Sequence, residues 1–514
     1  MNASRLPETQ AQRAGSAGAT RTPMADARGL RHGGPAAAAR TPARSAILSL
    51  GLALALAGCA SLAPDYERPP LPVPDQYAEA GAAPATQSAA DIEWRSYFVD
   101  ARLQRLIEQA LANNRDLRLA VLRVDEARAA YGVQRADRVP TVGASLDATR
   151  SRVPADLSGI GRPVVGNQIQ LGIGLSTWEL DFWGRVRSLE SAALSSYLAS
   201  DEARRAATLS LIAQTADGYL SLAELDERIA LARRTVATRK ETLRIFRRRV
   251  ELGATSKLDL TQVEVLDQQA ETLVSQLEQS RAVQAHALAK IVGAGADLPQ
   301  GGERLDEIRV SQDLEPGLPS ELLSRRPDII AAEHDLRAAN ANIGAARAAF
   351  YPRIALTGAL GTASNELEGL FRSGSHAWTF APQISLPIFD GGRRQASLDL
   401  AEVRRDQAVV RYEQAIEAAF RDVSDALSAQ RWLAEQVRTL RETLAAQTER
   451  ARLAKLRYDS GAARYLEVLD AERELLSAQQ QLAQTRRAQL SAQVALYAAL
   501  GGGSQHIAPD NKVR

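Results

Sequence analysis

One stretch of the chain is too long and too regular for a compact globular domain. From Arg393 to Tyr458 the sequence contains neither proline nor glycine, and Ala, Arg, Glu, Gln and Leu dominate it. These residues favour helix, and at about 1.5 Å per residue the helix would be roughly 100 Å long. Apolar residues recur at coiled-coil spacing from Ile416 to Leu444. After a turn at Asp459–Ala462, a second helix is predicted to return to Leu500.

The same hairpin is predicted earlier in the chain, which indicates a tandem duplication. Gly184 and Gly253 have the same spacing as Gly392 and Gly461, so each pair marks a helix start and a hairpin turn. One such unit could not bury its apolar faces alone. We expect two repeats, each with a short helix, two strands and a long helical hairpin. The predicted organisation is a leader over residues 1–58, a proline-rich tether over 59–92, a first repeat over 93–300, a linker over 301–320, a second repeat over 321–502 and a tail over 503–514.

The first 58 residues have the features of a secretory leader, and Met24 is an alternative start to Met1. The apolar run Ser45–Ala57 leads into Gly58 and Cys59, which is the only cysteine of the sequence. Leu56–Cys59 is similar to a bacterial lipoprotein box. The similarity implies cleavage before Cys59, acylation of its thiol and new amino group, and sorting to the outer membrane. Apart from this covalent lipid, no cofactor is expected. The alternative is an ordinary signal peptide with an unrelated cysteine.

Short helices are predicted over Leu103–Asp137 and Glu321–Arg347. Each is followed by two segments in which apolar residues alternate with small or polar ones. One face is apolar and the other is small or polar, which is typical of a half-buried strand. The alternating segments are residues 142–149, 168–175, 354–361 and 378–386, with loops predicted at Arg150–Asn167 and Gly361–His376. Strands of about ten residues match the length of a tilted membrane strand. A soluble sandwich is the alternative.

Four strands cannot close a membrane barrel, and an open sheet would leave backbone groups unpaired in lipid at several kcal/mol each. Several chains must therefore share one barrel. Two chains would give an interior filled by side chains, whereas three would leave a lumen. Pro387 is expected at the crossing from strand to helix, and Pro382 is unexplained by the strand pattern.

Several motifs in order resemble the TolC/OprM-type outer membrane factors, a family of NodT-like efflux lipoproteins. They are Pro64–Tyr66, Leu323–Ile329, Phe350–Pro352 and Ser385–Arg393, and the resemblance extends over residues 59–502. It implies an α+β membrane protein: a homotrimer with a twelve-stranded transmembrane β-barrel, four strands per chain, and a periplasmic α-helical coiled-coil barrel. It also implies a lipid-anchored outer-membrane efflux channel that serves a periplasmic adaptor and an inner-membrane pump of the resistance-nodulation-division type.

Charged residues near the two hairpin turns are the candidate functional residues. Asp259 and Glu467 each follow a turn glycine, Gly253 or Gly461, by the same interval, and Asp470 shares a helix face with Glu467. In a trimer each acid would form a ring of three carboxylates, which favours cations. By the resemblance, Glu467 and Asp470 correspond to selectivity rings.

The resemblance also implies residues that tie the hairpins together when the channel is closed. These are Asp259 and Tyr458, with Arg464 as a third tie, although it stands one place later than the family's arginine. The alternative for all five gate residues is that they are solvated charges on a coiled coil.

Other classes of function find little support in the sequence. The five histidines are scattered, no phosphate-binding loop follows a strand, and methionine is absent after Met24, so no enzyme and no metal site are predicted. The formal net charge of +2 gives no reason to expect nucleic acid. The alternatives left open are an export channel of the same fold for protein secretion and a periplasmic adaptor lipoprotein.

Overall fold

The computed structural model describes residues 61–78, 88–293, 295–299, 301, 305–310, 314 and 316–508. Contacts divide the chain into residues 1–57 and a unit from Gly58 to Arg514, and every described residue belongs to the second unit. The predicted leader and Cys59 lie outside the described residues.

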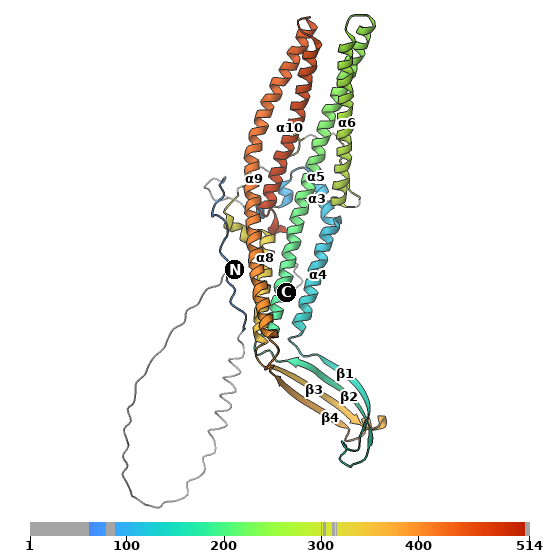
Figure 1. The fold of residues 1–514 in the computed structure, drawn as a ribbon, viewed down its shortest axis with the longest axis vertical. Coiled ribbons are helices and arrows are strands. Elements are labelled where there is room, and N and C mark those ends of the chain that lie inside the picture. The colour runs from blue at the N-terminus through green and yellow to red at the C-terminus, as the bar shows by residue number, and fades with distance from the viewer. Residues whose placement is uncertain are drawn as a thin grey trace, which may run out of the picture. The chain divides into compact units, whose positions relative to one another are not determined.

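Two long helical hairpins make up most of the described chain (Figure 1). The first consists of α5 (Arg185–Glu251) and α6 (Lys257–Val292), and the second of α9 (Arg393–Asp459) and α10 (Tyr465–Ala499). Gly184 and Gly392, with φ of 70° and 85°, precede the two 67-residue helices. Both hairpins predicted from the sequence are therefore confirmed, including the glycines that start them.

The short helices are interrupted, so the prediction of one helix over Leu103–Asp137 and one over Glu321–Arg347 is wrong. The first splits into α3 (Ala101–Asn113) and α4 (Arg115–Ala136), and the second into α7 (Leu322–Arg325) and α8 (Pro327–Ala348). Asn114 is extended and caps α4 by accepting from the Leu117 N–H, whereas Arg326 is extended because a proline follows it. The remaining helical turns are Ala89–Asp91, Trp94–Tyr97, Pro319–Glu321, Leu367–Phe371 and Ser504–His506.

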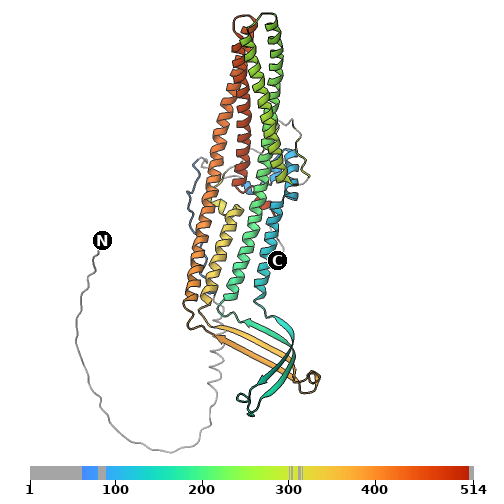
Figure 2. The ribbon, with the colours of Figure 1, turned by 45° about the vertical axis from the view of Figure 1, so that its right-hand side comes forward.

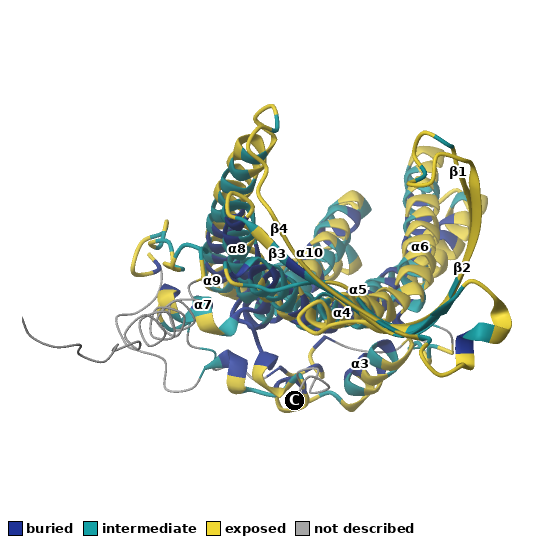
Figure 3. Cartoon of the chain, turned by 90° about the horizontal axis from the view of Figure 1, so that it is seen from below, coloured by how far each residue is buried: buried dark blue, intermediate teal, exposed yellow. Residues whose placement is uncertain are grey.

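The helices pack side by side into a wall (Figure 2). Near the sheet the contacts run α4–α5–α8–α9, and toward the hairpin turns they run α6–α5–α10–α9. Each half of the wall thus contains one unbroken helix, α5 or α9, beside two shorter helices. Helix α3 packs on α5 and lies on one face of the wall (Figure 3). None of the described helices is long and apolar enough to cross a membrane.

Four antiparallel strands form one sheet in the order β1-β2-β3-β4, with β1 at Val142–Val153, β2 at Val164–Glu179, β3 at Arg353–Ser364 and β4 at His376–Ser385. The register places apolar residues of all four strands in line, since Ile173 lies opposite Ala144 and Leu360, and Leu360 lies opposite Trp378. In one chain these side chains are mostly exposed (Figure 3). The predicted alternation is therefore confirmed, and its apolar face has no covering layer in the described chain.

The predicted loops between paired strands are too long. Residues 150–153 pair with 164–167, so the first loop shrinks to 154–163. Strand β3 continues to Ser364, and the second loop shrinks to 365–375. Antiparallel pairing needs only backbone hydrogen bonds, so the ladder continues past the point where the apolar alternation stops.

An extended segment, which we call the N-terminal strap (residues 61–78), lies along α8 and α9. The Asn340 side chain donates to the Pro64 carbonyl over 2.8 Å, and Tyr77 stacks on Phe420. Glu333, which is 3% exposed, accepts from the Arg68 guanidinium at 2.9–3.1 Å and from the Tyr66 hydroxyl at 3.0 Å. Glu333 is the main polar anchor of the strap.

Candidate functional site

The two hairpin turns lie together at the end of the helices that is remote from the sheet (Figures 1 and 2). Gly253 and Gly461 have φ of 70° and 77°, and no atom lies within 4 Å of the place where a Cβ would stand. The next residue's N–H bonds back to the helix in both turns, from Ala254 to the Arg249 carbonyl and from Ala462 to the Arg457 carbonyl, each over 2.8 Å. Both turns are thus helix ends of the left-handed glycine type, as the sequence predicted.

Three aromatic rings join the two hairpins just below these turns. Phe246 of α5 lies 4.6 Å from Tyr465 of α10, and Tyr465 meets Tyr458 of α9 edge to face at 4.8 Å. The Tyr465 hydroxyl also hydrogen-bonds to Thr242 over 3.1 Å, and burial raises its pKa to about 12. We call Phe246, Tyr458 and Tyr465 the tip aromatic cluster. Of the three, sequence reasoning identified only Tyr458.

The Tyr458 hydroxyl accepts a hydrogen bond from the Arg249 guanidinium. Arg249 also lies 5.7 Å from the ring centres of both Tyr458 and Phe246, within cation–π range. This contact links α5 of the first hairpin to α9 of the second. The sequence predicted Tyr458 as a tie between hairpins but assigned it no partner. Arg249 was missed, although it stands four residues before Gly253 as Arg457 stands before Gly461.

Asp259 forms a capping box at the start of α6. Its carboxylate accepts from the Ser256 and Thr255 hydroxyls over 2.7 and 3.0 Å, and its N–H donates to the Ser256 hydroxyl. These hydrogen bonds, the Ser256 one first, lower the pKa of Asp259, and the positive charge of Arg464 adds a smaller effect. Among the candidate ties, the structure therefore brings Arg464 near Asp259, whereas Tyr458 hydrogen-bonds to Arg249.

Glu467 and Asp470 face arginines of their own hairpin. Glu467 pairs with Arg457 of α9 at 2.5 Å, and Asp470 pairs with Arg450 of α9 and Arg473 of α10, both at 2.7 Å. Both acids are 40% exposed, so water reaches them. The two candidate ring acids lie on one side of α10, as their spacing predicted, and each has a cationic neighbour that sequence reasoning had not assigned.

Asp259 and Glu467 occupy equivalent repeat positions but have different environments because their helices begin differently. Ser256 caps α6, whereas Arg464 stands at the start of α10 and makes no capping hydrogen bond. Asp259 therefore hydrogen-bonds to the capping residue Ser256, whereas Glu467 pairs with Arg457. In the described part of the chain, no group of three or more His, Cys, Asp or Glu side chains could hold a metal ion.

Comparison with known proteins identifies relatives along almost the whole chain. Residues 106–294 and 318–502 match the family model described as outer membrane efflux protein. Outer membrane protein OprJ of Pseudomonas aeruginosa is 45% identical over 463 residues, which cover 89% of this chain and 95% of OprJ. The toluene efflux pump outer membrane protein TtgC of Pseudomonas putida is 42% identical, with the same shares covered.

Solved structures agree with these sequence relatives. The open state of the Neisseria gonorrhoeae MtrE outer membrane channel superposes with a TM-score of 0.78 at 39% identity, covering 86% of this chain and 98% of MtrE. The outer-membrane channel OprN superposes with a TM-score of 0.81 at 30% identity, covering 87% of this chain and all of that structure. The match extends over both repeats in sequence and in fold.

Proposed function

The chain belongs to the outer membrane efflux protein family, and from this membership we propose that it is the outer-membrane channel of a tripartite efflux system. It conducts small molecules passively from an inner-membrane pump and a periplasmic adaptor to the exterior. The observation that carries the proposal is the 45% identity to OprJ across both repeats. A sheet with one continuous apolar face, joined to a wall of long helices, is the architecture that such a channel requires.

Three chains would complete the channel. The sheet has two free edges, β1 and β4, and a membrane sheet with free edges is unstable in lipid. Three copies would bring β4 of one chain beside β1 of the next and close a twelve-stranded barrel. The helices below would close in the same way into a periplasmic tunnel. Two copies would leave no lumen.

Pro382 fits this arrangement. The Ala363 N–H donates to the Ser375 carbonyl, so these two facing residues form a hydrogen-bonded pair. In an antiparallel ladder, hydrogen-bonded and non-hydrogen-bonded pairs of facing residues then alternate along β3 and β4. By that alternation Leu356 and Pro382 form a non-hydrogen-bonded pair, and the Pro382 nitrogen is directed away from β3. The missing donor of Pro382 therefore leaves the pairing inside the chain intact, and it would lie at the seam with the next chain.

The hairpin tips are the proposed gate. Arg249 and the tip aromatic cluster would hold the second hairpin against the first in the closed state. Glu467 and Asp470 would form two acidic rings in the trimer and favour cations, with Arg450, Arg457 and Arg473 moderating their charge. The tips would also be the end that meets the adaptor, with a pump of the resistance-nodulation-division type beyond it.

The protein resides in the outer membrane, and Cys59 is its proposed acylation site. The strap leaves its first described residues beside Gly344, near the end of α8 that leads into β3. The strap thus reaches the end of the helices that leads into the sheet, which supports an anchor upstream of it. Cys59→Ser should abolish labelling by radioactive fatty acid and slow leader removal. Unchanged labelling and processing would contradict acylation at Cys59.

Single-channel recording in planar bilayers tests the channel function. Wild-type protein should give a small conductance that prefers cations. Changing Glu467 and Asp470 together to alanine should reduce or reverse that preference, because three arginines would lose their paired carboxylates. The matched control is Glu435 and Glu442, two exposed acids of α9 that pair with Arg438, changed to alanine. Absence of any conductance from correctly folded protein would refute the proposal.

A further inference from the structure

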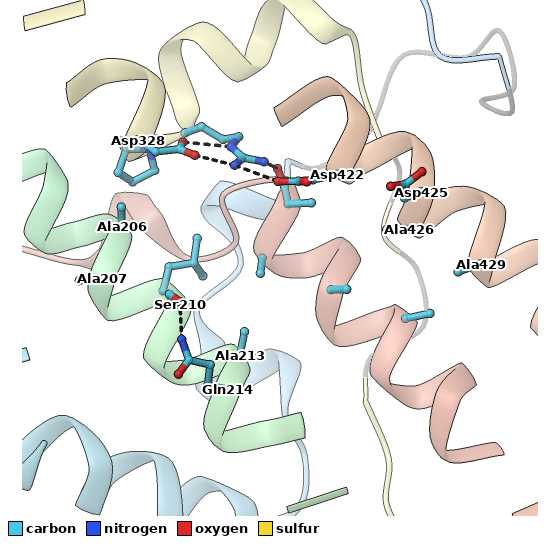
Figure 4. Close-up of a pocket in the computed structure, with 17 residues that line it drawn as sticks. Ala206, Ala207, Ser210, Ala213, Gln214, Asp328, Asp422, Asp425, Ala426 and Ala429 are labelled. Carbon is cyan, nitrogen blue, oxygen red and sulfur yellow. Dashed lines mark hydrogen bonds and ion pairs between the residues drawn. The ribbon is translucent and has the colours of Figure 1, made fainter. Parts of the chain in front are cut away.

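A hollow of about 780 Å³ lies in the helical wall where α10 ends and α8 begins (Figure 4). Its walls come from α5, α9 and α10, together with the turn at Arg326–Asp328. Most of the lining residues are alanines of the three helices, so no large side chain fills the space. Its volume falls in the range of pockets that hold drug-sized molecules.

The hollow opens on the face of the wall opposite α3. Ile212 and Tyr219 of α5 pack in the same core as Leu103 and Ile107 of α3. Ser210 and Gln214 stand two positions from Ile212 on either side, about 200° around the helix, and both are exposed and line the hollow. Seen from below, the helices form an arc that is concave on the side away from α3 (Figure 3). We therefore place the tunnel of the proposed trimer on that face, and the hollow is then a recess in the tunnel wall.

The rim of this recess is negatively charged. Asp328, Asp422 and Asp425 line it, and the only cation in the lining is Arg326. Arg326 is 8% exposed and donates to both oxygens of Asp328 and to the Ala499 carbonyl. Outside the lining, Arg421 pairs with Asp422 at 2.8 Å and reaches Asp425 only at 3.9 Å. Three carboxylates against two guanidinium groups leave a net negative charge.

We infer that this recess binds amphipathic organic cations on their way through the channel, an inference that rests on the proposed function. The alanine surface would take the flat apolar body of the molecule, and Asp425, whose side chain is 77% exposed, would face its positive charge. The recess has no aromatic ring in its lining and is open on one side. Binding is therefore weak, which suits a transit site because a passing molecule must also leave.

The test measures fluorescence anisotropy of rhodamine 6G, a cation, and of fluorescein, an anion of similar size. The full-length protein is held in phosphatidylcholine nanodiscs, and empty discs are subtracted. Wild type should bind rhodamine 6G more tightly than fluorescein. Asp425→Asn should weaken rhodamine binding about fivefold, the effect of one exposed ion pair. Asp425→Lys should reverse the preference between the dyes, and Ala429→Leu should weaken both by filling the recess.

Matched controls stand on the same helix outside the recess. Asp406→Asn removes an exposed acid of α9, and Ala445→Leu enlarges an exposed alanine; neither should change dye binding. Equal binding by wild type, Asp425→Lys and Ala429→Leu, or no saturable binding by wild type, would overturn the inference. Conductance recorded on the same preparation separates the two proposals. A conducting channel without dye preference refutes only the recess. Dye binding without conductance refutes the channel and the transit role of the recess, but not the binding itself.

Discussion

Single side chains decide how the two hairpin tips interact, even though the repeats place equivalent residues there. Arg249 and Arg457 stand at matching positions before the turns, yet Arg249 crosses to Tyr458 of the other hairpin, whereas Arg457 pairs with Glu467 of its own. The difference follows from the residue that begins the returning helix. The Asp259 carboxylate, which matches that of Glu467, accepts from the Ser256 hydroxyl, and Arg249 contacts Tyr458 instead.

Arg249→Gln should open the proposed gate. Loss of the guanidinium removes the charge-assisted hydrogen bond and the cation–π contact with Tyr458 of the other hairpin. It also removes a cation–π contact with Phe246 of the same helix. We expect a higher single-channel conductance or open probability, and a similar, smaller effect from Tyr458→Phe. Arg248→Gln is the control, since Arg248 is exposed and pairs with Glu251, three residues away on the same helix. Conductance as low as wild type in Arg249→Gln would place the gate elsewhere.

Glu333→Gln should loosen the N-terminal strap. Glu333 is buried and accepts from Arg68, Tyr66 and Arg337, so loss of its charge leaves two guanidinium groups without their carboxylate. Because Arg68 is 47% exposed, we discount the cost to about 2 kcal/mol. Cleavage after the exposed Glu67 by a glutamate-specific protease should become roughly thirtyfold faster.

The control for the strap is Glu402→Gln. Glu402 is 43% exposed and reaches Arg347 only at 3.5 Å, so its loss should leave cleavage after Glu67 unchanged. Equal cleavage rates in the two variants would show that Glu333 does not hold the strap.

At the scale of elements, the end of one helix meets the start of another in the same way in both repeats: α6 meets α4, and α10 meets α8. Asn114, just before α4, donates to the Ile291 carbonyl in the last turn of α6, and Arg326, just before α8, donates to the Ala499 carbonyl at the end of α10. A glycine with positive φ follows each of these helix ends, Gly293 at 94° and Gly501 at 75°. At each of these two helix junctions, a side chain thus donates a hydrogen bond to a helix end that would otherwise leave carbonyls unpaired.

Gly501→Ala should destabilise the protein more than Gly461→Ala. Both glycines have left-handed backbone, which costs an alanine about 1–2 kcal/mol. At Gly461 a Cβ would meet no atom within 4 Å, whereas at Gly501 it would lie 2.8 Å from the Arg325 carbonyl oxygen. The melting temperature of the helical circular dichroism signal should fall further in Gly501→Ala. An equal fall in both variants would show that the contact with the Arg325 carbonyl can relax without loss of stability.

At the scale of the whole molecule, the sheet has an exposed apolar face and two free edges, which we expect further copies of the chain to pair. Native mass measurement in detergent should give three copies, since three is the smallest number that leaves a lumen. Dilution that separates the copies should also disrupt the strands, because the edges lose their partners. A monodisperse monomer with an intact sheet would contradict the trimer.

The sequence by itself determined the elements and their duplication. Helix propensity, period-two alternation and matching glycines are local properties of the chain, so the hairpins, the strands and the turns at Gly253 and Gly461 were predictable. The breaks at Asn114 and Arg326 were not predicted, although both carry local signals in a capping side chain and a following proline. Family membership was predictable because its motifs are contiguous in the sequence.

Only the tertiary structure decided which side chains meet between elements. Tyr458 and Arg249 come from different repeats, and nothing in their local sequence indicates that they meet. The recess near Asp425 depends on how three helices and one turn pack, which no single periodicity encodes. Contacts between residues distant in sequence depend on the relative position of whole helices. That position is fixed by the sum of many weak packing interactions rather than by any local preference.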